Sequence, residues 1–163
     1  SQGELKPALA SMTIATNFLH RARAEVSQSV SQKNELWHVE TFRCNAQSRT
    51  EDVINGLIDY KDKVRLSHNL FTLRSDRLIV ITKKNENNLI QSLLAVGNVK
   101  IDNPLMKAQG GYMSFNVETG EVTMFGETKN TARISVNGGK KIEGQKIKFV
   151  IDNTGVCSDI RGE

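Results

Sequence analysis

The sequence predicts an all-β domain preceded by an N-terminal α-helix. From residue 36 onward, apolar residues recur at every second position in short runs separated by Gly, Asn and Asp, a pattern typical of strands. Strand pairs also recur at a nearly constant interval, which indicates a stacked fold. With 163 residues, 38% apolar and 25% charged, the chain can bury its own core. That composition excludes collagen, low-complexity disorder and a multi-span membrane protein.

The first 35 residues predict a separate N-terminal segment. Residues 5–30 carry apolar side chains at steps of three and four, which indicates an amphipathic helix, and a Ser/Gln/Lys/Asn-rich linker follows at 27–35. The expected organisation is therefore a helix and linker over 1–35 and a β domain over 36–163. We expect the helix to pack on the domain or to cover a sheet edge, with binding to a lipid surface or a partner as the alternative.

Short alternating runs then succeed one another along the β domain. Polar and glycine-rich turns separate them, and "NVETGEV" predicts a hairpin with Thr119 and Gly120 in its turn. The pattern predicts a sandwich, a jelly roll or a barrel. The expected strands are Leu36–Phe42, Leu57–Tyr60, Lys63–Leu66, Leu70–Leu73, Arg77–Thr82, Leu93–Val96, Val99–Ile101, Tyr112–Val117, Glu121–Phe125, Thr131–Val136 and Lys146–Ile151.

An internal repeat assigns the faces of these strands. Equivalent strands begin at Arg77, Tyr112 and Lys146, which are separated by 35 and 34 residues. Side chains two positions apart share a face of a strand, so two of the three equivalent strands have one apolar and one mostly polar side. Leu78–Ile81 is apolar on both sides, which favours a strand covered on both. A stack of such strand pairs forms a quasi-one-dimensional fold with open ends.

Charge, cysteines and motifs narrow the classes of function. The formal net charge is +4, which permits an anionic partner without requiring one. Cys44 and Cys157 lack metal-ligand spacing, and two unpaired, half-buried thiols are favoured over a disulfide, which would need an oxidising compartment. The chain has no G-x-S-x-G, no H-E-x-x-H, no dinucleotide fingerprint and no phosphate-binding glycine loop, and its three histidines are scattered. We therefore expect no enzymatic activity, no cofactor and no metal.

The ordered series of strand pairs resembles a known family. The segments "LIDYKDKVRLSHNLFTLRSDRLIVIT", "LLAVGNVKI", "GGYMSFNVETGEVTMFGE" and "KKIEGQKIKFVIDNTG" look like the LptA/OstA-like periplasmic lipopolysaccharide-transport bridge proteins. The similarity covers roughly Trp37 to Ile160 and is best over Gly111–Glu127 and Ile142–Ile151. Two features depart from that family: the N-terminal helix and the polar stretch from Asn45 to Asn55. A relative of the inner-membrane component LptC, which shares the fold, is the second choice.

The resemblance implies a folded-over antiparallel β-jelly roll and a transport function. It implies that the protein carries lipopolysaccharide between the inner and outer membranes, in the periplasm of a Gram-negative-type bacterium, by holding the acyl chains of lipid A in an apolar groove. It also implies end-to-end stacking with like domains, as a head-to-tail homo-oligomer and with inner- and outer-membrane transport components that share the fold. The implied groove residues are Leu78, Val80, Met113, Phe115, Val117, Val122, Met124, Ile134, Val136, Ile147, Phe149 and Ile151.

Basic side chains near the opening of such a groove are candidates for contact with phosphate. The candidates are Lys140, Lys141, Lys146 and Arg77, and a solvated outer face is the alternative for each of them. For the whole interior, a closed dry core fits the same alternation. A structural or interaction scaffold of the cell envelope without lipid binding therefore stays open. A nucleic-acid-binding β domain is the third hypothesis. It is less favoured, because no pair of aromatic residues forms a stacking platform.

Overall fold

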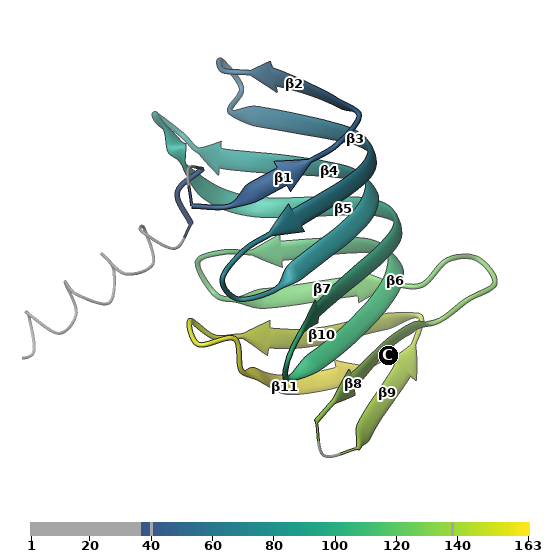
Figure 1. Ribbon diagram of the computed structural model, residues 1–163. Coiled ribbons are helices and arrows are strands. Elements are labelled where there is room, and N and C mark those ends of the chain that lie inside the picture. The colour runs from purple at the N-terminus through teal and green to yellow at the C-terminus, as the bar shows by residue number, and fades with distance from the viewer. Residues whose placement is uncertain (1–36, 40, 138) are drawn as a thin grey trace, which may run out of the picture. The chain divides into compact units, whose positions relative to one another are not determined.

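The computed structural model describes residues 37–39, 41–137 and 139–163, and these contain strands connected by turns (Figure 1). The helix and linker expected over 1–35 lie outside the described residues. The strands are β1 (Arg43–Asn45), β2 (Ser48–Asp52), β3 (Leu57–Ser67), β4 (Thr72–Lys83), β5 (Glu86–Asn103), β6 (Met106–Asn116), β7 (Glu121–Phe125), β8 (Ala132–Val136), β9 (Lys140–Gly144), β10 (Lys146–Ile151) and β11 (Cys157–Gly162).

All of these strands belong to one antiparallel sheet. The main path runs β1-β3-β4-β5-β6-β7-β10-β11, while β2 also pairs with β3, and β8 pairs with β6 and β9. Seven of the ten connections between these strands join neighbours in the sheet, because tight turns can link antiparallel strands directly. The predicted all-β, folded-over antiparallel class is confirmed.

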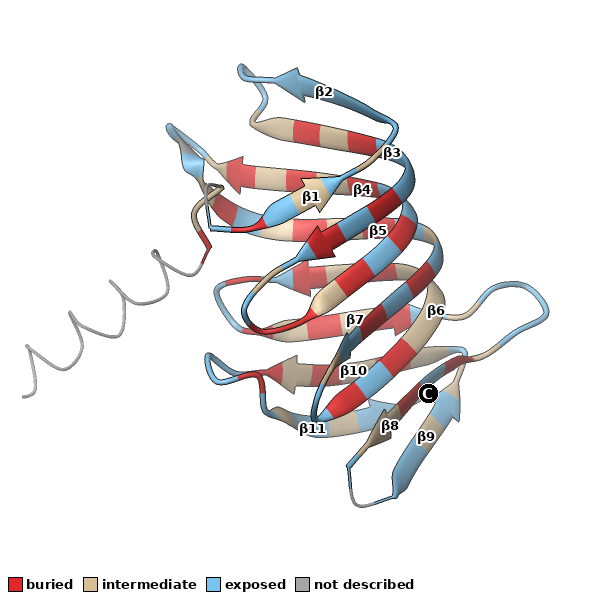
Figure 2. Ribbon diagram, in the orientation of Figure 1, coloured by how far each residue is buried: buried red, intermediate tan, exposed pale blue. Residues whose placement is uncertain are grey.

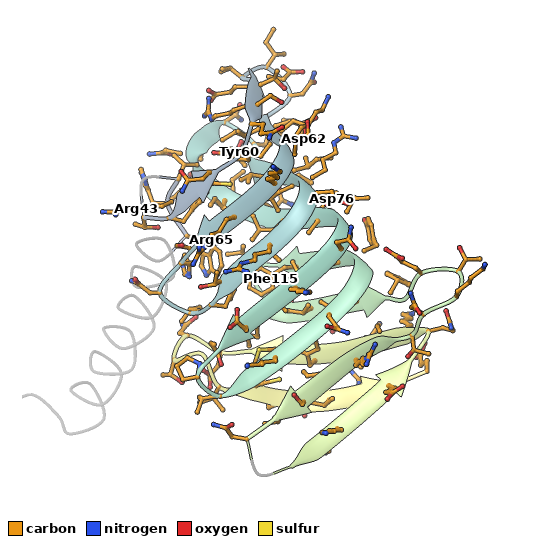
Figure 3. The ribbon with its side chains drawn as sticks, turned by 45° about the vertical axis from the view of Figure 1, so that its right-hand side comes forward. Arg43, Tyr60, Asp62, Arg65, Asp76 and Phe115 are labelled. Atoms are coloured by element: carbon orange, nitrogen blue, oxygen red, sulfur yellow. The ribbon has the colours of Figure 1, made fainter. Side chains whose placement is uncertain are left out.

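The sheet is bent across its middle along one continuous line. The register of three successive strand pairs shifts at the same level, between Lys61 and Val64, between Arg74 and Arg77, and between Val96 and Val99. Beyond β6 the sheet divides at that level, since β6 pairs with β7 on one side and β8 on the other. Asp62 and Asp76 lie along the bend (Figure 3).

The bend separates two limbs. Limb A contains β2, β7, β10, β11 and residues 57–61, 77–83, 86–96 and 112–116 of the long strands. Limb B contains β1, β8, β9 and residues 64–67, 72–74, 99–103 and 106–110. The turns far from the bend form the two rims. Residues 84–85, 117–120 and 152–156 form the rim of limb A, and residues 68–71, 104–105, 137 and 139 form that of limb B.

Local chemistry explains the position of the bend. The backbone takes positive φ at Asp62 (67°), Lys63 (52°), Gly97 (83°) and Asn98 (47°), a region that favours Gly and Asn. The Asn98 side-chain amide donates to Asp76 Oδ2 at 3.0 Å, which links β5 to β4 at the bend. The strands therefore turn where small or locally hydrogen-bonded residues interrupt the alternation.

The core lies between the two limbs, where their apolar faces meet (Figure 2). In limb A the register aligns two apolar rows across the strands: Ile58, Val80, Leu93, Phe115, Val122 and Phe149, and Tyr60, Leu78, Ala95, Met113, Met124 and Ile147. Limb B contributes the row Cys44, Leu66, Leu73, Ile101, Ala108, Ile134 and Ile142.

One expected strand is not formed, and two strands were not anticipated. Leu36–Phe42 does not form a regular strand; its described part makes an isolated bridge between His38 and Leu89, and β1 begins only at Arg43. Conversely, the polar stretch from Asn45 contains β2, and β9 was not anticipated. Every residue of β2 is exposed, so this edge strand has no buried side from which an alternation could arise.

Candidate functional site

The twelve groove residues expected from the sequence lie on the inner faces of the limbs. All except Val136, which is half-buried, are buried. Most belong to limb A, where Val80, Phe115, Val122 and Phe149 stand side by side on four strands. The structure thus brings together residues as far apart in the sequence as Val80 and Phe149, 69 positions, on one continuous apolar surface.

The facing wall, on limb B, was largely missed at the sequence level. Leu66, Leu73 and Ala108 are buried there beside Ile101 and Ile134. Each is an apolar residue between two polar neighbours in the sequence, and this alternation was the pattern from which an inward-facing position could have been predicted. The parts of β3, β4 and β6 that lie in limb B are short, and their alternation alone did not show that they face limb A.

An aromatic cluster closes part of the opening between the rims. Trp37 stacks on His68 with ring centroids 4.0 Å apart and packs at 5.1 Å from Phe115 and 5.8 Å from Phe71. The backbone around Trp37 pairs with the start of β5, through Ile90 N to Trp37 O at 2.8 Å. Trp37 is only 3% exposed, so the cluster seals the interior where β5 begins.

A second contact joins the rims through the side chain of Asn103. The side-chain amide of Asn103 donates to Gly155 O at 2.9 Å and to Leu70 O at 3.0 Å. Its oxygen accepts from the backbone N–H groups of Leu105 and Met106. One side chain therefore holds the β5–β6 turn of limb B against the β10–β11 turn of limb A.

The four basic candidates do not form one cluster. Arg77 and Lys146 lie on limb A and are paired, Arg77 with Asp59 at 2.8 Å and Lys146 with Glu163 at 3.4 Å. Hydrogen bonding from Arg77 lowers the pKa of Asp59 below its usual value. Lys140 and Lys141 lie on β9 in limb B, and Lys141 lines a hollow on the outer face of that limb. Of the four candidates, only Lys141 lines a concave surface and forms no ion pair with another described residue.

The buried side chains of the described residues are apolar except for Ser75 and Thr82. No group of three or more His, Cys, Asp or Glu side chains there is arranged to hold a metal ion. No helix among those residues is long and apolar enough to cross a membrane. The buried polar residues Ser75 and Thr82 are satisfied by backbone carbonyls. The dominant feature is the apolar interior.

Comparison with known proteins assigns the family. A family model described as "LptA/(LptD N-terminal domain) LPS transport protein" matches residues 44–154, which is more than half of the chain and runs from β1 to the turn before β11. The chain belongs to this family. The resemblance stated from the sequence is therefore confirmed, and the family is one of lipopolysaccharide transport proteins. A comparison with curated proteins gave no match.

A solved structure supports the fold of this LptA-family domain. LptH from Pseudomonas aeruginosa, described as the LptA homologous periplasmic component of the lipopolysaccharide transport device, superimposes with a TM-score of 0.60. The sequences are 19% identical, and the match covers 74% of this chain and 83% of LptH. At that identity the likeness shows a shared fold.

The LptA-family domain carries its two cysteines as free, half-buried thiols, as the sequence favoured. Both pack against the core, Cys44 on β1 and Cys157 on β11. Burial raises the pKa of Cys44 to about 12 and that of Cys157 to about 11. At pH 8 both therefore stay protonated, and a protonated thiol is a poor nucleophile.

This burial predicts slow alkylation of the folded protein. At pH 8, iodoacetamide should modify both cysteines at least about tenfold more slowly in the native chain than in urea, where their pKa values return to the ordinary range. Mass spectrometry of quenched time points measures both sites. Equal rates in the native and unfolded protein would show that β1 and β11 do not cover the thiols.

Proposed function

We propose that this protein binds the acyl chains of lipopolysaccharide between limb A and limb B and passes the lipid across the periplasm of a Gram-negative bacterium. The observation that carries the proposal is the unbroken apolar row from Ile58 to Phe149, which crosses six strands without a polar side chain. Membership of a lipopolysaccharide transport family supports it. Lipid transport of this kind requires no catalytic group and no cofactor in this chain.

The chemistry of acyl chains suits such a surface. Each methylene removed from water contributes about 0.8 kcal/mol, without any directional requirement. A row of apolar side chains therefore binds a chain strongly while leaving it able to slide from strand to strand. Sugars and phosphates gain nothing from this interior and would stay in water outside the rims.

The limbs must separate to admit a chain, because the interior side chains bury one another. Leu78, Leu93 and Phe149 are 0% exposed. Separation would open the side-chain packing, the Trp37 cluster and the Asn103–Gly155 contact. The hydrogen-bond ladders would stay intact, since long strands cross the bend within one sheet. Opening thus costs packing that an incoming acyl chain would replace.

The ends of the sheet support assembly with like domains. β2 is an edge strand that pairs only with β3, and β11 is an edge strand that pairs with β10. The free edge of a strand can add a strand of another sheet. We therefore propose head-to-tail stacking of this chain with its own copies and with inner- and outer-membrane transport components of the same fold, which would join their interiors.

Photo-crosslinking tests the groove. A benzophenone amino acid at Phe115 or Phe149 should label purified lipopolysaccharide, while the same group at Ser114 should not. Ser114 is the matched control because it lies on β6 next to Phe115 but faces outward, away from the buried Met113 and Phe115. Circular dichroism of each variant confirms that it is folded. Equal labelling at Ser114 and at both inner positions would refute the groove.

The closed interior also favours a second candidate, a structural scaffold of the cell envelope. Its supporting observation is the near-complete burial of both limb faces. The scaffold predicts no labelling of lipopolysaccharide from Phe115 or Phe149 in variants that remain folded. The same experiment therefore separates the two functions.

A further inference from the structure

The outer faces of the two limbs differ sharply in charge. On limb A several cations are paired: Lys61 and Arg77 lie 3.9 and 2.8 Å from Asp59, and Lys146 lies 3.4 Å from Glu163. The outward positions of limb B carry far more cations than anions. The exposed cations there are Arg43, Arg65, Arg74, Lys100, Lys107, Arg133 and Lys141, against Asp102 and Glu143.

Several of these cations are direct neighbours in the sheet. Arg65 is the register partner of Arg74, and Arg74 is the register partner of Lys100. None of the three forms an ion pair with another described residue. Like charges placed opposite each other destabilise a sheet, so folding alone does not account for this row. An anionic ligand would neutralise this row.

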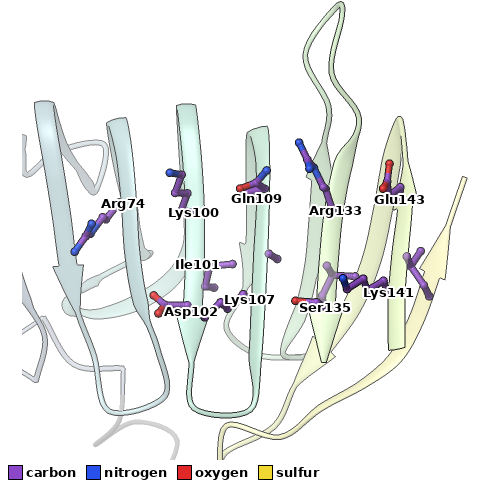
Figure 4. Close-up of a pocket in the computed structure, with 13 residues that line it drawn as sticks. Arg74, Lys100, Ile101, Asp102, Lys107, Gln109, Arg133, Ser135, Lys141 and Glu143 are labelled. Atoms are coloured by element: carbon purple, nitrogen blue, oxygen red, sulfur yellow. The ribbon is translucent and has the colours of Figure 1, made fainter. Parts of the chain in front are cut away.

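The cationic face is also hollowed. A pocket of about 540 Å³ lies over β4, β5, β6, β8 and β9 (Figure 4). Arg74, Lys100, Lys107, Arg133 and Lys141 line it together with two acidic residues, Asp102 and Glu143. Glu143 stands opposite Arg133 in the register but accepts a hydrogen bond from Thr131 Oγ1 at 3.2 Å. Cations therefore outnumber anions in the pocket.

The cations fall into two groups on either side of β6. Arg74 and Lys100 lie on β4 and β5, while Arg133 and Lys141 lie on β8 and β9. Neighbouring strands are about 4.8 Å apart, which places the two groups about 10–14 Å from each other. Between them lie Lys107 and Gln109. When the side-chain amide of Gln109 is placed with its oxygen toward Arg133, that oxygen accepts hydrogen bonds from Nε and Nη2 of Arg133 at 3.2 Å each. Gln109 therefore orients the Arg133 guanidinium.

We propose that this pocket binds a glycan that carries two phosphate groups, one held by Arg74 and Lys100 and the other by Arg133 and Lys141. Arginine and lysine side chains are strong donors to phosphate. The polar floor of Gln109 and Ser135, both half-buried, suits sugar hydroxyls. The size of the pocket fits a sugar-sized body better than a bare anion.

This site is separate from the proposed groove, because the two lie on opposite faces of the same strands. Lys100 points outward while its neighbour Ile101 is fully buried. However, Asp102 and Lys107 are opposite each other in the β5–β6 register, close to the β5–β6 turn at the rim of limb B. A phosphorylated head group of a lipid that enters between the rims could reach the pocket from that turn. A soluble phosphorylated glycan is the other source of the same chemistry.

The test is a titration of the full chain with a water-soluble glucosamine disaccharide bisphosphate that lacks acyl chains, followed by calorimetry at low salt. Binding should weaken steeply as salt is added, because exposed charges are screened. The unphosphorylated disaccharide and inorganic pyrophosphate are the comparison probes. Pyrophosphate places its charges too close together to reach both groups, so it should bind at least about tenfold more weakly.

Variants locate the site. Arg74→Gln with Lys100→Gln should weaken binding of the bisphosphate about tenfold, and so should Arg133→Gln with Lys141→Gln. The matched control is Lys83→Gln with Lys148→Gln, which removes two cations from limb A that form no ion pair with a described residue. The control should change the affinity less than about twofold. Equal weakening by all three pairs would overturn the site in favour of a diffuse positive field.

Two further arms assign the source of the ligand. The two probes are the soluble bisphosphate and micelles of a bisphosphorylated glycolipid. Loss of binding to either probe in the limb B variants supports the pocket. The probe that binds more tightly to the unsubstituted chain identifies the source of the ligand. A response to neither probe overturns it, as does equal affinity for a single-stranded oligonucleotide, which would indicate nucleic-acid binding instead. Photo-crosslinking from Phe115 in the unsubstituted chain tests the groove without reference to the pocket, so failure here leaves the proposed groove separately testable.

Discussion

Phe115→Ala should lower the free energy of unfolding by about 3–5 kcal/mol. Phe115 is 1% exposed and stands between Leu93 and Val122 in the central apolar row of limb A. It also touches the cluster that seals the rims, with Trp37 at 5.1 Å and Phe71 at 5.7 Å in an edge-to-face arrangement. Truncation removes aromatic contacts and leaves a cavity that neighbouring strands cannot easily fill.

Urea denaturation measures this loss. Trp37 is the single tryptophan of the chain, so its fluorescence reports the cluster directly, while circular dichroism reports the sheet. Ser114→Ala is the control, because it changes the same strand on its outward face and should alter stability by no more than about 0.5 kcal/mol. A loss below about 1 kcal/mol for Phe115→Ala would contradict the packing of the two limbs around this ring.

Gly97→Ala should destabilise the bend by about 2–3 kcal/mol. Gly97 has φ +83°, which an L residue adopts only under strain. An added Cβ would also lie 2.5 Å from Asp76 Oδ2 and 3.0 Å from Asp76 Cβ. Relief requires Asp76 to move, which would break its hydrogen bond with Asn98. Strain and collision therefore act together at the point where β5 crosses from limb A to limb B.

Gly139→Ala separates these two effects. Gly139 has φ +92°, and a Cβ added there meets nothing within 4 Å, so only the backbone strain remains, about 1 kcal/mol. Thermal unfolding of both variants should show the larger decrease for Gly97→Ala. Adding Asp76→Ala to Gly97→Ala should recover part of the loss. Equal decreases for the two glycine variants would mean that Asp76 does not constrain the bend.

The positions of the strands could be predicted from the alternation of apolar and polar residues wherever one face of the strand is buried. Residues 77–82 and 146–151 alternate between core and surface, and both lie within strands as expected. The prediction failed where that contrast is absent: β2 is exposed throughout, and β9 has no buried residue. Trp37 was placed in a strand, yet its role is tertiary, since it covers the opening by stacking on His68. The family was recognised from the ordered series of strand pairs, because that order is itself local in sequence.

At the candidate sites, too, some residues could be predicted from local sequence and others could not. Inner positions such as Met113 and Phe149 were predicted because side chains two apart share a face, and both are fully buried. Their partners on limb B were not, because opposition across the bend depends on where the strands fold. The row of Arg65, Arg74 and Lys100 could not be seen in the sequence either, since these residues meet only through the register of three strands.

The amino-acid order by itself thus determined the β class, the inward and outward faces and the family, because each rests on a period of two that short-range geometry imposes. Only the tertiary structure decided which faces oppose each other, how the rims close and where the cations gather. These depend on long-range pairing and on the line of positive-φ residues along which the sheet bends, and no neighbouring stretch of sequence encodes either one.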